Sequence, residues 1–497
     1  MRYVLSAILF AFSIAITPGV AQPQAGVNEI ITRAEKGDPD AQIELGRRYA
    51  EGRGVRQDHA EAARWYQMSA EQGNAGAQVL LAQCYEHGRG ANQDYTEAVR
   101  WYRRAAEQDS PDGEEGLGFM QEYGMGVPQN SVEAVRLFRR AAEKGNPTAE
   151  ARVGLAYEDG RGVAQNYTEA FRWFRKSADH GSALGQLSLA EMYKGGKGVQ
   201  QDAAQAALWV RKAAEQADEI AQVDLGIMYA QGVGVPRDNT QAVSWFRKAA
   251  GLGYDKGQFN LGSAYYYGMG VPQDFREAFR WFVKAANQGN GASQFALGQM
   301  YERGEGLEPD MHEAVRWYRL AASQGNAEAQ GSLGFIYLRG KGVERDYIEA
   351  GSWFLTAAKQ GDAYSQYQLG AMYETGNGVS KDIAAALYWY GKAAGQGEED
   401  ASRAVRRLSA LGIRPRVPSV PGSIEGRQRA HENPDAARQL TLAEIERLLK
   451  NGVPSKRIAE MVDRFGVSFE LSREAEADLR KLGADHNLLV VISSRRK

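Results

Sequence analysis

Residues 37–72 read GDPDAQIELGRRYAEGRGVRQDHAEAARWYQMSAEQ, and the same pattern returns every 36 residues as far as Gln396. No copy gains or loses a residue, so ten copies follow one another without a break. A fixed period of this length is typical of solenoids, in which each small unit buries its apolar face against its neighbours. The copies begin at Gly37, Gly73, Asp109, Gly145, Gly181, Ala217, Gly253, Gly289, Gly325 and Gly361.

The first half of each copy predicts a helix, which we name helix A. It carries Ala, Leu, Gly and Tyr at the spacing seen in Ala41–Tyr49, on one face of a 3.6-residue period. A Gly-x-Gly pair follows in every copy, from Gly52/Gly54 to Gly376/Gly378. Glycine adopts the left-handed conformation that closes a helix at little cost, so we expect helix A to end there.

The second half predicts another helix, which we name helix B. It begins at Asp or Asn with Glu or Gln three residues later, as in Asp58 and Glu61, and this spacing predicts a reciprocal capping box. All nine tryptophans of the chain occupy one position of helix B, and only copy three departs, with Leu137. Glycine within helix A, as at Gly154 and Gly226, costs about 1 kcal/mol relative to alanine. We therefore expect a neighbouring ring or backbone to approach it closely.

These elements resemble the Sel-1-like repeat, a relative of the tetratricopeptide repeat. The A-x-x-x-L-G-x-x-Y pattern is quoted from Ala329–Tyr337 and the W-Y-x-x-A-A pattern from Trp317–Ala322, and the resemblance covers residues 37–396. It implies an all-α fold, a right-handed αα-solenoid superhelix of ten 36-residue helix-turn-helix repeats. Members of this family are generally adaptor or scaffold proteins, although a fold alone does not fix a function.

The amino terminus is typical of a secretory signal peptide. Residues 1–21 contain Arg2, an apolar run over Val4–Ile16 and small residues before an expected cleavage site at Gln22. The alternative is an uncleaved membrane anchor, but the run is shorter than the ~20 residues of a spanning helix. We therefore expect a secreted chain, located in the bacterial periplasm.

The remaining segments flank the repeats. We expect residues 22–36 to form an amino-terminal capping helix and residues 397–411 a carboxy-terminal one, because terminal repeats need a polar outer face. The Pro- and Arg-rich residues 412–437 are typical of an extended linker. Helical signals return over residues 438–497, which predict a small, separate helical module.

The sequence offers no recognisable catalytic or cofactor motif. None of the Gly-x-Gly loops continues into a phosphate-binding loop, the six histidines are scattered without metal-ligand spacing, and no Gly-x-Ser-x-Gly elbow occurs. Cys84 is the only cysteine, so no disulfide forms within the chain. Some cysteine-rich secreted relatives are linked to penicillin binding, but this sequence departs from their pattern. We therefore predict a protein without cofactor or metal that is not an enzyme.

Charge limits the partners further. The chain has 60 Lys and Arg against 62 Asp and Glu residues, a net charge of −2, so it lacks the basic field that nucleic-acid binding requires. Positions 7, 11 and 14 of helix A could be polar if packing alone decided them. Several copies place aromatic rings there, and in related solenoids helix A lines the concave surface, where rings act as binding anchors. Alternatively, these rings pack between neighbouring A helices and do not contact a partner. The aromatic residues concerned are Phe119, Phe259, Tyr266, Phe295, Phe335 and Tyr367.

Together these features predict an extracytoplasmic, periplasmic scaffold or adaptor that binds a protein or peptide on the concave face of the solenoid. One alternative is a secreted enzyme acting on cell-wall material or β-lactams, suggested only by the cysteine-rich relatives. Another is a eukaryotic lumenal scaffold of the secretory pathway. Against that alternative stands the single glycosylation sequon, Asn166-Tyr167-Thr168.

Overall fold

The computed structural model describes residues 24–418, 445, 458, 473–482, 484 and 488–489. The expected signal peptide (1–21), residues 419–437 of the expected linker and most of the module 438–497 lie outside these residues. All described elements are helices: α1 (Gln24–Glu35), α2 (Pro39–Glu51), α3 (His59–Glu71), α4 (Ala75–His87), α5 (Tyr95–Glu107), α6 (Pro111–Tyr123), α7 (Ser131–Glu143), α8 (Pro147–Asp159), α9 (Tyr167–Asp179), α10 (Ala183–Gly195), α11 (Ala203–Glu215), α12 (Glu219–Gln231), α13 (Asn239–Gly251), α14 (Asp255–Tyr267), α15 (Phe275–Asn287), α16 (Gly291–Arg303), α17 (Met311–Ser323), α18 (Ala327–Arg339), α19 (Tyr347–Lys359), α20 (Ala363–Thr375), α21 (Ile383–Ala394), α22 (Glu399–Ser409) and α27 (Arg473–Lys481).

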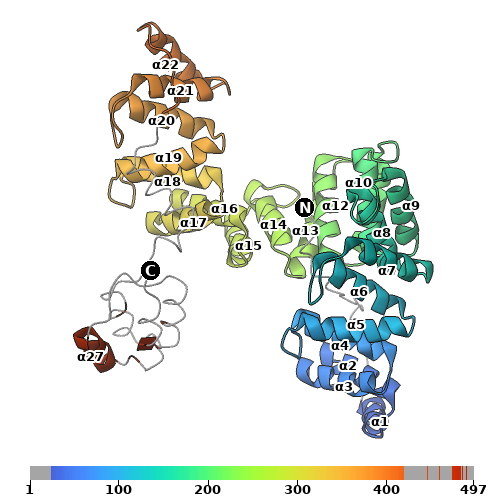
Figure 1. The fold of residues 1–497 in the computed structure, drawn as a ribbon. Coiled ribbons are helices and arrows are strands. Elements are labelled where there is room, and N and C mark those ends of the chain that lie inside the picture. Colours follow the sequence, from blue (N-terminus) through green and yellow to red (C-terminus); the bar gives the residue numbers. More distant parts are fainter. Residues whose placement is uncertain are drawn as a thin grey trace. The chain divides into compact units, whose positions relative to one another are not determined.

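The chain divides into two compact units, and we describe each by itself. Unit 1 comprises Met1–Ala264 with Gly268–Pro272, and unit 2 comprises Tyr265–Tyr267 with Gln273–Lys497. Within each unit the helices pack in chain order as successive pairs, the even-numbered helix of each repeat being helix A and the odd-numbered one helix B (Figure 1). The predicted all-α helix-turn-helix repeats are therefore confirmed in the described residues.

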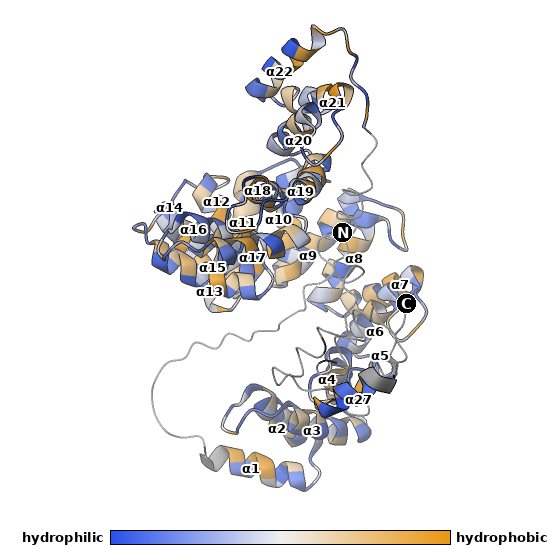
Figure 2. Ribbon diagram, turned by 90° about the vertical axis from the view of Figure 1, so that its left-hand side faces the viewer, coloured by the Kyte–Doolittle hydropathy of each residue, from blue (hydrophilic) through white to orange (hydrophobic). Residues whose placement is uncertain are grey.

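In most repeats the core forms where helix B places an aromatic ring against a glycine of helix A; repeats 2 and 5 have Ala82 and Ala190 at that position. In repeat 4 a Cβ added to Gly154 would lie 2.5 Å from Cδ1 of Phe174, which is fully buried. The close ring approach predicted at this glycine is thus confirmed. In most helices the opposite face carries exposed residues, whereas α19 is buried or half-buried from Tyr347 to Ala358. Figure 2 shows hydrophobic and hydrophilic segments alternating along single helices such as α1.

The loop between the two helices is built as expected at its start and differently at its end. Gly52 closes α2 in the left-handed conformation, at φ 73°, which confirms the predicted stop. Asp58 caps α3, since its Oδ1 accepts hydrogen bonds from the backbone N–H groups of Ala60 (2.9 Å) and Glu61 (3.1 Å). The reciprocal half of the predicted capping box is wrong, because the Asp58 N–H donates to the carbonyl of Tyr49 at 2.9 Å.

The glutamates of the predicted capping boxes therefore serve another purpose. Glu61 pairs with Arg64 one turn further along the helix, at 3.4 Å. Such exposed pairs three residues apart contribute only about 0.2–0.5 kcal/mol each. Glu349 is the buried exception, and it accepts a hydrogen bond from Nε1 of Trp353 at 3.0 Å. The same surface pairing recurs as Glu97–Arg100, Glu133–Arg136, Glu169–Arg172, Glu277–Arg280 and Glu313–Arg316.

In most repeats a buried glutamine of helix A bonds both to a glutamine at the end of helix B and to the helix before the repeat; repeats 3 and 4 have Glu114 and Glu150 at this position. We call this series of glutamines the glutamine ladder. In repeat 1, Gln72 Nε2 donates to Gln42 Oε1 at 2.8 Å, and Gln42 Nε2 donates to the Ala34 carbonyl of α1 at 3.1 Å. Because buried polar groups are costly when unpaired, this ladder fixes the register of the stack. The glutamine pair recurs as Gln108–Gln78, Gln216–Gln186, Gln324–Gln294, Gln360–Gln330 and Gln396–Gln366.

The two flanking helices cover the ends of the repeat array. Ala34 of α1 is fully buried beside the first repeat, and Ala401 and Leu408 of α22 are buried beside the last. After α22 the chain turns back over α21, where the Arg416 N–H donates to the Ala384 carbonyl at 3.0 Å. The end of repeat 10 is therefore covered by a helix and a short strap.

Candidate functional site

The six aromatic residues proposed as partner-binding positions all lie on A helices, and all are half-buried. Phe295 of α16 contacts Tyr318 of its own repeat with ring centroids 5.7 Å apart, and Tyr367 of α20 contacts Tyr390 in the same way at 5.5 Å. Part of each of these two rings therefore packs in the core of its own repeat. The remaining four lie at Phe119 (α6), Phe259 and Tyr266 (α14) and Phe335 (α18).

Phe119 and Tyr266 have polar neighbours that fix their positions. The guanidinium of Arg152 lies over the Phe119 ring, 4.4 Å from its centroid, and pairs with Glu115. The hydroxyl of Tyr266 donates to Oε2 of Glu305 at 2.6 Å. Both rings are thus held in place by charged groups, and replacing either would disturb the packing as well as any contact with a partner.

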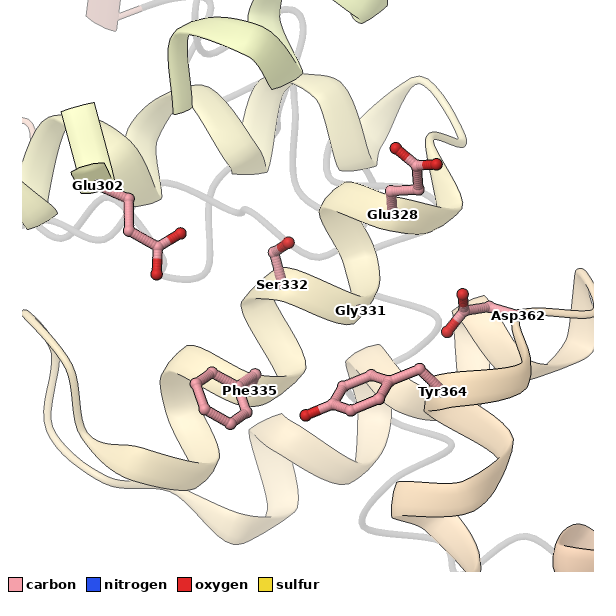
Figure 3. A pocket seen from close by; sticks show the side chains of 7 residues that line it. All are labelled: Glu302, Glu328, Gly331, Ser332, Phe335, Asp362 and Tyr364. Atoms are coloured by element: carbon pink, nitrogen blue, oxygen red, sulfur yellow. The ribbon is translucent and has the colours of Figure 1, made fainter. Parts of the chain in front are cut away.

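Phe335 is the one of the six that lines a described cavity, on the helix A side of unit 2. The cavity has a volume of about 340 Å³ and lies between α16, α18 and α20 (Figure 3). Figure 3 shows the rings of Phe335 and Tyr364 close together along one side, with the carboxylates of Glu302 and Glu328 on the other. The lining residues are Glu302, Glu328, Gly331, Ser332, Phe335, Asp362 and Tyr364.

The cavity exists because one repeat lacks a side chain that its neighbours have. Position 7 of helix A is Phe295 in repeat 8 and Tyr367 in repeat 10, whereas repeat 9 has Gly331 there. A Cβ added to Gly331 would lie 3.1 Å from Oγ of Ser365, so even a small side chain would extend into this space. Sequence reasoning missed Gly331, Ser332 and Tyr364, although a glycine within a run of aromatics was a usable signal.

Three carboxylates give the cavity its electrostatic character. Glu302 accepts a hydrogen bond from the hydroxyl of Tyr318 at 2.8 Å and pairs with the exposed Lys341 at 3.5 Å. Asp362 caps α20 by accepting from the Ser365 N–H at 2.7 Å, and Glu328 is exposed in the first turn of α18. Burial raises the pKa of Tyr318 above its usual value, so its hydroxyl remains a donor to Glu302.

A second hollow lies on helix B of repeat 8 and has the opposite charge. It has a volume of about 550 Å³ and combines basic groups with the exposed Leu320. Its lining residues are His312, Val315, Arg316, Arg319, Leu320, Ser323 and Val343. Among the described residues, no group of three histidine, cysteine or acidic side chains is arranged to hold a metal ion.

Asp224, on α12 of unit 1, is a buried acidic group that should make the stability of the protein depend on pH. Desolvation raises its pKa to about 6, with Lys194 opposing and Glu191 adding to the shift. Because the folded-state pKa exceeds the unfolded value of about 4, this group's stabilisation is complete below pH 4 and is lost as the pH rises through 6. We expect Asp224→Asn to raise the free energy of unfolding at pH 7 by about 1 kcal/mol, after allowance for solvent screening.

The check is urea unfolding of wild type and Asp224→Asn at pH values between 4 and 8. The two curves should converge at low pH and separate as the pH rises through about 6. A constant difference across this range would show that Asp224 titrates at its ordinary pKa.

Comparison with known proteins identifies the repeat. The Sel1 repeat profile matches ten consecutive segments: 39–74, 75–110, 111–146, 147–182, 183–218, 220–254, 255–290, 291–326, 327–362 and 363–398. The chain belongs to the Sel1 repeat family. The resemblance predicted from the sequence is therefore confirmed, and Sel1 repeats of this kind are scaffolds typical of protein–protein interaction.

Two solved structures of Sel1 repeat proteins resemble the chain along most of their own length. One is c5321, described as a protective antigen present in uropathogenic Escherichia coli strains; it is 32% identical, with 92% of this chain and 98% of that chain covered and a TM-score of 0.56. The other is a Sel1 repeat protein from Oxalobacter formigenes, 35% identical over 62% of this chain and 90% of that chain, with a TM-score of 0.51. A search of curated proteins finds no match.

For this Sel1 repeat chain the comparisons bear on function only in general terms. The Sel1 solenoid is typically a non-catalytic scaffold, which agrees with the non-enzymatic role expected from the sequence. None of the described helices has both the length and the apolar run that crossing a bilayer requires.

Proposed function

We propose that this protein is an exported scaffold, periplasmic in a bacterial cell, that binds another protein on the helix A side of repeats 8–10. The cavity between α16, α18 and α20 carries this proposal, because it combines two rings with groups able to form hydrogen bonds. Small sites that mix aromatic anchors with polar groups are where binding energy concentrates. Sel1 repeats as a class support a protein partner.

Export is supported by residues 1–21, with their apolar run and small residues before Gln22. The similar protein c5321 is described as a protective antigen, and we carry over to this chain, as an expectation, only that such a protein is accessible outside the cytoplasm.

The test uses the full chain, expressed in its own host and recovered with its bound proteins from the extracytoplasmic fraction. We expect Tyr364→Ala to lower the recovery of a specific partner by about tenfold, since an aromatic anchor at such a site contributes on the order of 1–3 kcal/mol. Tyr364 is 42% exposed, so its loss should leave the fold intact.

Tyr167→Ala is the matched control. Tyr167 is a comparably exposed tyrosine, at 36%, but lies on helix B of repeat 4 in unit 1. Equal recovery with both variants would reject the cavity as the binding site. Recovery of the chain from the cytoplasm with residues 1–21 still attached would reject export, and turnover of a chromogenic β-lactam or of peptidoglycan would reject the scaffold role.

A further inference from the structure

The charge of the cavity restricts what it can bind. Three of its seven lining residues are acidic, Glu302, Glu328 and Asp362, and none is basic. The cations nearby lie at its rim: Lys341 is half-exposed and pairs with Glu302, and the guanidinium of Arg339 lies over the Phe335 ring, 5.5 Å from its centroid. An anionic ligand would meet the carboxylates of Glu328 and Asp362, whereas a cation would meet complementary charge.

A buried hydroxyl lies beside the cavity, although it is not one of the lining groups. Ser365 is fully buried, and its Oγ has no hydrogen-bond partner among the described residues. This oxygen lies 3.1 Å from the point where a Cβ on Gly331 would stand, so it faces the space that the missing side chain leaves. Buried hydroxyls are rarely left unpaired, because they lose their hydrogen bonds to water without replacement.

The aromatic pair fits the stem of a long basic side chain. Phe335 and Tyr364 lie close together along one side of the cavity (Figure 3), and lysine and arginine carry apolar stems that pack on such surfaces. The contact between Arg339 and Phe335 already shows that this ring accepts a guanidinium on its face. At about 340 Å³ the cavity is at the small end of ligand sites, which suits one inserted side chain.

We propose that the cavity binds a lysine or arginine side chain presented by an extended segment of a partner protein. The stem packs against Phe335 and Tyr364, and the cationic head pairs with Glu328 and Asp362. This inference rests on the proposed function, since it names the partner chemistry of the same cavity.

The test measures retention of peptides on the immobilised full chain. The probes are four pools of decapeptides, random except for a fixed central residue: arginine, lysine, norleucine or glutamate. We expect the arginine and lysine pools to be retained about tenfold better than the other two, because only they supply both stem and charge. Retention should also fall as ionic strength rises.

Two variants locate this preference. Glu328→Gln removes one exposed carboxylate without changing shape, and Gly331→Phe restores the bulk present at Phe295 and Tyr367. Each should reduce retention of the basic pools about tenfold. Glu344→Gln, an exposed glutamate outside the lining of the cavity, is the matched control and should leave retention unchanged.

Equal retention of the norleucine pool would overturn the proposal, as would undiminished retention in Glu328→Gln. A full chain with Arg495, Arg496 and Lys497 replaced by glutamine tests this chain's own basic terminus as the occupant. If only that variant bound the basic pools, a separate partner would be rejected. If Tyr364→Ala abolished partner recovery while the pools showed no preference, the basic side chain would be wrong and the scaffold function would stand.

Discussion

A Lys176→Ala/His180→Ala variant is expected to lose about 3–5 kcal/mol of unfolding free energy, because it leaves a buried carboxylate without a cation. Glu150 of α8 occupies the position where most repeats have the ladder glutamine, and its side chain is fully buried. It lies 3.0 Å from the ammonium of Lys176, on α9, and 2.9 Å from Nδ1 of His180, the residue that ends α9. These two groups replace the glutamine partner of the other repeats.

The design separates an orphaned charge from simple loss of contacts. Glu150→Gln/His180→Gln should rebuild the uncharged pair seen at Gln78 and Gln108, and we expect its stability to lie within about 1 kcal/mol of wild type or above it. Urea unfolding of the three proteins provides the measurement. If the alanine variant were as stable as the glutamine variant, the carboxylate would not need Lys176 and His180, and burial of Glu150 in solution would be less complete than in the structure.

The predicted and unpredicted parts of the fold differ in the range of the interactions behind them. The helix ends and the ring beside Gly154 involve residues of a single repeat, so one 36-residue period contained the information. The buried glutamine of the ladder also bonds to the helix before its own repeat, and Gln42 cannot be told from other polar residues until Ala34 is placed beside it. The predicted capping box does not form, because the Asp58 N–H donates to the Tyr49 carbonyl of the preceding helix. The sequence rules for a single helix do not take such a bond between helices into account.

The candidate site was predicted only at its edge, for a related reason. The sequence predicted binding at aromatic rings that helix packing did not require, and Phe335 is the one of these rings that lines the cavity. Yet Phe295 and Tyr367 turned out to contact rings of their own repeats, Tyr318 and Tyr390. The cavity depends on Gly331, where the side chain present in repeats 8 and 10 is absent, and the pattern of surplus aromatic rings does not indicate such a position. The difference is visible only when repeat 9 is aligned with the repeats on either side of it.

Gly298→Ala is expected to cost about 2–3 kcal/mol of unfolding free energy, although alanine is the better helix former by about 1 kcal/mol. The new methyl would lie 2.5 Å from Cδ1 of Tyr318, whose side chain is almost fully buried. This ring cannot turn away freely, because its hydroxyl is bound to Glu302 at 2.8 Å. Gly391→Ala is the matched control in the same unit: no atom lies within 4 Å of its added Cβ, so we expect a gain of about 0.5–1 kcal/mol.

Another repeat of the chain has alanine at the position of Gly298 and a smaller side chain at the position of Tyr318. Repeat 5 has Ala190 at the position of Gly298, and there Val210 replaces the ring, within the same core cluster. Gly298→Ala/Tyr318→Val should therefore cost less than the sum of its two single variants, since residues in direct contact are not additive. Unfolding of all four proteins in urea gives the coupling. Additive losses would mean that glycine at this position is required for the backbone rather than for the ring, and Ala190 would then remain without an explanation.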